Sequence, residues 1–119
     1  MKLFESGEDY LERILVLQEK NGQVRSIDIV KDMGFTKPSV SVAMKKLKES
    51  SLIDIDKNGL ITLTPIGLEI AKRIYERHLV LTQFFMSMGV DEEIAKKDAC
   101  KVEHDLSEET FEAIKKSLK

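Results

Sequence analysis

A β-hairpin signal near the middle of the chain most constrains its fold. In LIDIDKNGLITLT, residues 52–64, apolar residues alternate on both sides of Asn58-Gly59. Alternation around Asn-Gly is a strong signal for two strands joined by a tight turn. Three segments with a helical pattern precede the hairpin, and this order of elements predicts a winged helix-turn-helix.

Capping residues and glycines mark where these three helices are expected to begin and end. Apolar residues follow helical spacing over residues 7–21. Ser26 is expected to cap a short second helix that Gly34 closes. Thr36 is expected to begin the third helix, with Pro38 in its first turn, where proline is tolerated.

A longer helical region is expected after the hairpin. A helix that begins at Thr64-Pro65 should reach about Met88. Asp91 and Ser107 should cap two further helices, over residues 92–106 and 108–119. The long helix carries more apolar residues than one buried stripe requires. One interpretation is a helix buried on all sides, but a small chain has little material to surround it. We therefore expect a homodimer joined through this region.

Composition excludes several classes of protein. The chain has 119 residues and a formal net charge of −2, which argues against coating nucleic acid by charge alone. No apolar run approaches the roughly 20 residues that span a bilayer, and the first residues lack the apolar core of a signal peptide. We expect a cytoplasmic protein with no membrane partner and, with its single cysteine, no intrachain disulfide.

Six side chains with oxygen, nitrogen or sulfur donors fall on three of the expected helices. They are Asp9, Glu12, His78, Cys100, Glu103 and His104. The first two share a face of the first helix, and the last three stand at i, i+3 and i+4 of one helix. A metal site needs donors that converge from separate elements, because one helix face rarely encloses a cation.

Each donor also has a simpler interpretation. Asp9 and Glu12 suit the first turn of a helix, where the dipole favours acids. Cys100 alone is most often a small buried hydrophobe, and His78 could be a surface residue. Cys100 near His104 suggests a nucleophile pair, but no Gly-rich oxyanion loop accompanies it, and we expect no enzyme.

The motifs together resemble the iron- and manganese-dependent repressors, the diphtheria-toxin-repressor and manganese-transport-regulator family. The resemblance covers nearly the whole chain. The segments that carry it are GEDYLERI at 7–14, TKPSVSVAMKKL at 36–47, GLITLTPIG at 59–67, RHLVLTQFF at 77–85 and DACKVEHDLS at 98–107. Family members repress metal-uptake genes and bind double-stranded operator DNA as dimers when loaded with Mn²⁺ or Fe²⁺.

The resemblance implies a mainly α protein with two domains. A winged helix-turn-helix DNA-binding domain would occupy residues 1–63, and a helical metal-binding and dimerisation domain residues 64–119. The sequence has no segment for the SH3-like third domain of the iron type, so a short two-domain form is expected.

The resemblance also implies that the six donors above are metal ligands, in a mixed set. Asp9 and Glu12 match the manganese type of the family, whereas Cys100 matches the iron type. The ancillary-site ligands of the iron type are replaced here by Thr82 and Lys96. Carboxylates suit Mn²⁺ or Fe²⁺, a thiolate suits softer ions, and Co²⁺ or Zn²⁺ could bind in vitro.

The resemblance places DNA contacts on the third helix and the wing. The residues expected to bind DNA are Thr36, Lys37, Pro38, Ser39, Val42, Lys45, Lys57 and Asn58. Thr36 and Ser39 suit phosphates at a helix N-terminus, and Pro38 suits a thymine methyl group. Val42 stands where iron-type relatives have Gln. We expect no small organic substrate. The alternative is a winged-helix DNA-binding or interaction module that no metal regulates.

Overall fold

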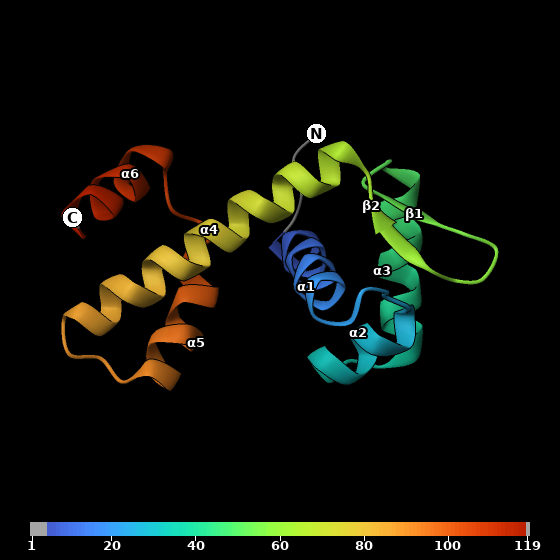
Figure 1. Ribbon diagram of the computed structural model, residues 1–119, viewed down its shortest axis with the longest axis horizontal. Helices are drawn as coiled ribbons and strands as arrows, with labels where there is room; N and C mark the ends of the chain where they lie inside the picture. Colours follow the sequence, from blue (N-terminus) through green and yellow to red (C-terminus); the bar gives the residue numbers. More distant parts are fainter. Residues whose placement is uncertain (1–4, 119) are drawn as a thin grey trace. The chain divides into compact units, whose positions relative to one another are not determined.

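The structure, a computed structural model, describes residues 5–118. Within that range, helices and strands follow one another as Figure 1 shows. They are α1 (Glu5–Asn21), α2 (Ser26–Met33), α3 (Lys37–Glu49), β1 (Ile53–Ile55), β2 (Ile61–Leu63), α4 (Pro65–Ser87), α5 (Glu92–Val102) and α6 (Glu108–Ser117). The expected fold class, a winged helix-turn-helix followed by a helical region, is confirmed.

The chain divides into two compact units between Lys72 and Arg73, a boundary that falls inside α4. The first unit holds α1, α2, α3, the hairpin and the start of α4. The second holds the rest of α4 with α5 and α6. The functional domain boundary expected between residues 63 and 64 stays a prediction.

The first unit has a core to which all of its helices and both strands contribute. Its fully buried apolar side chains include Leu11, Ile14, Ile29, Val40, Met44, Ile53 and Ile61. Burial of one such side chain contributes about 1.5–3 kcal/mol. The wing is tied to this core, because the backbone N–H of Ile61 donates to the carbonyl oxygen of Val24 at 2.8 Å.

Caps fix the ends of α2 and α3. The prediction that Ser26 caps α2 is wrong, because Ser26 is the first helical residue and Arg25 occupies the cap position. The carboxylate of Asp28 accepts the backbone N–H of Arg25 at 2.9 Å, so the helix is capped from its own third residue. Gly34, at φ +71°, closes α2 and Thr36 caps α3, both as expected.

The wing is an antiparallel hairpin in which Ile53 pairs with Leu63. Its loop is held by a side chain, because Asp56 Oδ1 accepts the backbone N–H groups of Asn58 at 2.8 Å and Leu60 at 2.9 Å. The predicted hairpin around Asn58-Gly59 is therefore confirmed, with a loop whose shape its own aspartate stabilises.

The start of α4 is anchored to the segment that precedes β1. Thr64 Oγ1 donates to the carbonyl oxygen of Ser51 at 2.8 Å and accepts the backbone N–H of Gly67 at 3.2 Å. A Cβ atom at position 67 would overlap the carbonyl oxygen of Leu52. This close backbone approach requires glycine in the first turn of α4.

The second unit is helical. Asp91 and Ser107 cap α5 and α6 as expected, accepting backbone N–H groups at 3.2 Å and 3.1 Å. Its buried apolar side chains are Ile74, Leu81, Ala95, Ala99 and Phe111. This packing places α5 and the turn that follows it against the middle of α4, where His78 lies.

Candidate metal centre and nucleic-acid interface

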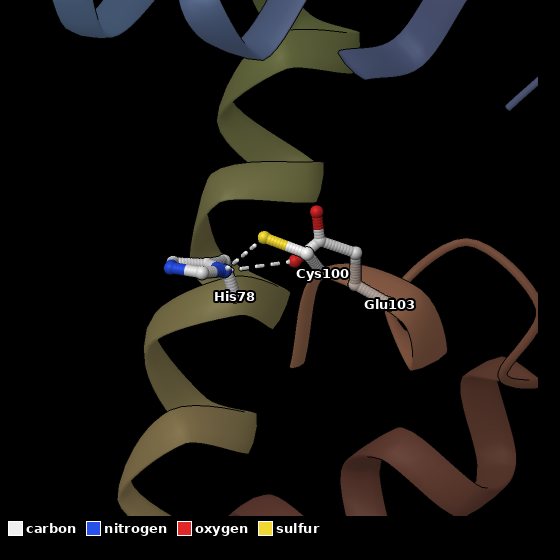
Figure 2. A group of neighbouring side chains, drawn as sticks. All are labelled: His78, Cys100 and Glu103. Atoms are coloured by element: carbon white, nitrogen blue, oxygen red, sulfur yellow. Dashed lines mark hydrogen bonds and ion pairs between the residues drawn. The ribbon is translucent and has the colours of Figure 1, made fainter. Parts of the chain in front are cut away.

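Three of the six predicted ligands meet within the second unit. The side chain of His78 projects from α4 and that of Cys100 from α5, whereas Glu103 is the first residue after α5 (Figure 2). His78 Nδ1 lies 3.1 Å from Glu103 Oε2 and 3.7 Å from Cys100 Sγ. One donor atom from each residue lies within 4.8 Å of the other two, a spacing suited to a single metal ion.

The helix that carries these donors ends earlier than predicted. α5 was expected to continue through Leu106, but it stops at Val102, and residues 103–105 form a turn. Glu103 keeps a right-handed helical conformation, and its N–H donates to the carbonyl oxygen of Ala99. Because of that conformation, Glu103 still lies near Cys100 although it is outside the helix.

Glu103 is the best-buried charged residue of the described chain, with 0% exposure. Its Oε2 faces His78, whereas its Oε1 has no hydrogen-bond partner among the described residues. The Nε2 of His104, whose side chain is also buried, lies 3.5 Å from that oxygen. A buried carboxylate oxygen without a hydrogen bond is costly, and coordination of a cation would satisfy it. The nitrogen, oxygen and sulfur donors present fit a divalent transition metal.

Hydrogen bonds with Cys100 and Glu103 raise the pKa of His78. The pKa of its imidazole is raised from 6.5 to about 10, first by the hydrogen bond with Cys100, then by that with Glu103, against an opposing effect of burial. The metal-free centre therefore carries a proton on His78 at neutral pH. That proton occupies a nitrogen that a metal ion would need.

The remaining predicted ligands lie elsewhere in the chain. Asp9 and Glu12 belong to α1 of the first unit, one turn apart, and their part in the site stays a prediction. At the ancillary positions, the Thr82 hydroxyl donates to the carbonyl oxygen of His78 at 2.7 Å, and Lys96 pairs with Glu92 at 3.2 Å. These two side chains have local roles within their own helices.

The role of Arg77 was not predicted from the sequence, in which it is notable only as the residue before His78. In the structure its guanidinium is buried and donates a hydrogen bond to the turn that carries Glu103. The only signal in the sequence was the Arg-His pair itself, which does not reveal a contact to a turn 26 residues away.

The predicted DNA-binding residues are all exposed in the first unit. They are Thr36, Lys37, Pro38, Ser39, Val42, Lys45, Lys57 and Asn58. On α3, Pro38, Val42 and Lys45 lie on one side of the helix, opposite the buried Val40, Met44 and Leu47. Val42 is 55% exposed, so it does not serve the core of the first unit.

No helix in residues 5–118 is long and apolar enough to cross a membrane.

Fold and site together define a transcriptional regulator with a winged DNA-binding region and a helical region that can hold metal. Residues 2–60 match the family described as iron dependent repressor, N-terminal DNA binding domain. Residues 64–119 match the family described as iron dependent repressor, metal binding and dimerisation domain. The chain belongs to this family of metal-dependent transcriptional repressors, and it is not an enzyme.

Relatives agree with this assignment. An uncharacterized HTH-type transcriptional regulator of Methanocaldococcus jannaschii is 36% identical over 93% of this chain and 90% of its own length. The transcriptional regulator MntR of Escherichia coli O6:H1 is 34% identical over 91% of this chain and 70% of its own length.

A solved structure of a manganese-dependent transcriptional repressor in complex with manganese is 27% identical. It has a TM-score of 0.86 over 94% of this chain and 52% of that one. The chain therefore spans about half the length of that structure.

Proposed function

We propose that this protein is a metal-responsive repressor that binds operator DNA as a homodimer when it is loaded with Mn²⁺ or Fe²⁺. The genes it controls would be those of metal uptake. The observation that carries the proposal is the buried carboxylate of Glu103, which faces His78 and Cys100 and has one oxygen without a hydrogen bond to any residue from 5 to 118.

The proposed ligand set has six members. They are Asp9, Glu12, His78, Cys100, Glu103 and His104. When bound, a divalent cation supplies positive charge that offsets the mutual repulsion of the carboxylates. The carboxylates are hard donors, the two imidazoles suit several transition metals, and the thiolate is a soft donor. This mixture supports Mn²⁺ or Fe²⁺ as the physiological ion, with Co²⁺ and Zn²⁺ able to bind in vitro.

The proposed switch depends on the fact that the six ligands belong to both units of the chain. Asp9 and Glu12 belong to α1 of the first unit, whereas the other four ligands belong to the second unit. A shared site would limit how the two units move relative to each other. In a dimer, that limit would fix two α3 helices at the ~34–36 Å that successive major grooves require. Metal would favour the conformer that binds DNA over the one that does not. The change in their populations is limited by the difference in metal affinity between these two conformers.

Exposed apolar side chains support a dimer through the second unit. They are Leu79, Met86, Met88 and Ile94, each at least 42% exposed. Leu79 and Met86 stand seven residues apart and therefore share one side of α4, where a partner subunit would cover both. A dimer would place two wings and two α3 helices on one DNA duplex.

Lysines on α3 support the DNA contact. Lys37 lies at the start of the helix and Lys45 two turns later, both exposed. Loss of either lysine should lower the salt slope of DNA binding by roughly 0.9 per phosphate contact removed. This readout separates phosphate contacts from the base contacts expected of Pro38 and Val42.

The test uses the full chain and a duplex selected by it from a random pool in the presence of Mn²⁺. DNA binding is measured by fluorescence anisotropy with Mn²⁺, Fe²⁺, Co²⁺, Zn²⁺ or excess chelator, in reducing buffer. We expect tight binding only with metal, and its loss in Glu103→Gln with every ion. Glu109→Gln, which neutralises an exposed carboxylate on α6, is the matched control and should bind as wild type. Equally tight binding in chelator would establish the alternative, a winged-helix module that no metal regulates.

A further inference from the structure

Arg77 is a buried cation with well-defined partners. Its side chain is only 9% exposed. Its Nη1 donates to the carbonyl oxygens of Glu103 at 3.1 Å and Leu106 at 2.6 Å. Its Nη2 donates to Glu108 Oε2 at 2.9 Å, and the guanidinium carbon lies 5.2 Å from the ring centre of Phe111. One side chain of α4 therefore contacts the turn after α5 and the first half of α6.

Two consecutive residues of α4 bind Glu103, one at its side-chain carboxylate and the other at its backbone carbonyl group. His78 bonds its carboxylate at 3.1 Å, and Arg77 bonds its backbone carbonyl at 3.1 Å. Consecutive residues on a helix point about 100° apart. The two contacts therefore approach Glu103 from different directions and restrain both its position and the direction of its side chain.

The two carbonyl oxygens that Arg77 binds, those of Glu103 and Leu106, lie past the end of α5 and accept no hydrogen bond from an N–H group of that helix. The last carbonyls of an α-helix lack intrahelical donors, and Glu103 follows the last residue of α5. Glu103 itself is fully buried, so its carbonyl oxygen cannot rely on water. Without Arg77, the turn at residues 103–106 would have to move to find new donors, and it would carry Glu103 and His104 with it.

The cost of burying this guanidinium points to a role beyond stability. Arg77 Nε is buried and has no hydrogen-bond partner among the described residues. Its ion-pair partner Glu108 has a side chain that is 65% exposed, so water screens that pair. A buried cation with an unsatisfied donor and a screened counter-ion contributes little net stability. Its contacts are better explained by the geometry they impose on Glu103.

We propose that Arg77 is the positioning residue of the metal centre: it fixes the turn that presents Glu103 and His104 to the ion, and it links that turn to α6 through Glu108 and Phe111. This inference rests on the proposed metal site and adds a residue that does not touch the ion. It also makes metal affinity dependent on the docking of α6.

The test compares Arg77→Met, Arg77→Lys and Glu108→Gln with wild type in the full chain, using Co²⁺ as the probe. Three quantities are measured: the Kd for Co²⁺, the visible absorption spectrum of bound Co²⁺, and the Tm of the metal-free protein in chelator. Arg77→Met should raise the Kd roughly 10- to 100-fold, as is usual for groups that orient a metal ligand, and should alter the spectrum. Arg77→Lys should recover part of the affinity, because its ammonium can reach one carbonyl. Glu108→Gln should cost less than Arg77→Met, since both carbonyl contacts remain.

Lys115→Gln is the matched control. Lys115 on α6 pairs with Glu76 on α4 at 3.4 Å, so its loss also breaks an α4–α6 ion pair, but one without contact to the turn. It should leave the Kd and spectrum unchanged. A loss of affinity in Lys115→Gln as large as that in Arg77→Met would overturn the inference, because general loosening of α6 would then explain both. If Arg77→Met does not fold without metal, Arg77→Lys and Glu108→Gln decide by the same comparison.

The outcomes separate this inference from the proposed function. Wild-type affinity and spectrum in Arg77→Met would overturn the positioning role and leave the metal-responsive repressor standing. Absence of Co²⁺ binding by wild type would overturn both. Co²⁺ binding that Arg77→Met weakens, without any effect of metal on DNA binding, would support the positioning role and overturn the repressor proposal.

Discussion

His78 Nδ1 lies 3.1 Å from Glu103 Oε2, and this pair joins the middle of α4 to the turn that follows α5. The carboxylate of Glu103 is fully buried, whereas the imidazole is 19% exposed. In the absence of metal, a proton on His78 provides the positive charge that this buried carboxylate lacks. The same two atoms are proposed ligands, so proton and metal compete for the pair.

The stability of the metal-free protein should depend on pH through His78. Its pKa is raised from 6.5 to about 10, by Cys100 first and Glu103 second. When the pKa of a basic group is higher in the folded protein than in the unfolded chain, its contribution to the free energy of unfolding is complete below the pKa of the unfolded chain. That contribution should decline as the pH rises above 6.5 and should be lost near 10. The measurement is the Tm in chelator across this range for wild type and His78→Gln.

The difference in Tm between the two proteins isolates the histidine from other titrating groups. It should be largest at pH 6.5 and should shrink as the pH approaches 10. A constant difference over that range would show that His78 is not the titrating group.

Cys100 should determine which metal the protein prefers. Its Sγ lies 3.7 Å from His78 Nδ1 at an exposed position, where a soft donor can reach the same ion. Cys100→Glu should raise the response to Mn²⁺ relative to Co²⁺ and Zn²⁺, and Cys100→Ala should weaken binding of the softer ions most. Metal affinities measured beside the Tm of each variant check this. An unaltered metal profile in Cys100→Ala would exclude the thiol from the site.

Local chemistry made most element boundaries predictable. Gly34, Thr36 and Ser107 act on backbone groups within a few residues, so their effects can be inferred from sequence spacing. Ser26 is not the cap of α2, because the hydroxyl of Ser26 and the carboxylate of Asp28 predict different starts for this helix. The carboxylate of Asp28, three residues past the cap, accepted the backbone N–H of Arg25 and shifted the helix start by one residue.

The end of α5 could not be predicted, because no residue of KVEHDL breaks a helix. Where the helix ends, Arg77 of α4 donates to the carbonyl oxygens of Glu103 and Leu106, which lie 26 and 29 residues later in the sequence. A contact between distant residues has no local signature, and tertiary interactions of this kind override helix propensity. The same reason explains why the candidate ligands were predictable and the residue that positions one of them was not.

Gly67→Ala should destabilise the first unit. A Cβ at this position would overlap the carbonyl oxygen of Leu52, a backbone atom that cannot rotate away. Overpacking of this kind typically costs about 1–3 kcal/mol of unfolding free energy. Ala71, on the same helix and already fully buried, shows that a methyl group by itself is tolerated on α4. Urea denaturation of Gly67→Ala against wild type measures the cost, and equal midpoints would contradict the close packing.

A charge at Leu79 should separate the proposed dimer. Leu79 is 48% exposed on α4, and the exposed Met86 lies two turns later on the same side of the helix. Burial of a carboxylate in such an interface without a partner is costly. Sedimentation velocity should show a dimer for wild type and a shift toward monomer for Leu79→Glu. A monomeric wild type at tens of micromolar would count against the dimer itself.

Val42 should read a thymine methyl group in the operator. It is 55% exposed on the side of α3 that carries Pro38 and Lys45, and its apolar branches cannot hydrogen-bond a base edge. In the major groove, the apolar group available for contact is the C5-methyl of thymine. Uracil lacks that methyl and keeps every hydrogen-bonding group, so replacing one thymine at a time in the selected duplex should locate the contact. Loss of one buried methyl is worth about 0.8 kcal/mol, or roughly fourfold in Kd. The same uracil should have no effect on Val42→Ala, which no longer reaches the methyl, while both proteins respond equally to uracil at other positions. A duplex in which no thymine-to-uracil change distinguishes wild type from Val42→Ala would remove Val42 from base readout and leave Pro38 as the apolar contact on α3.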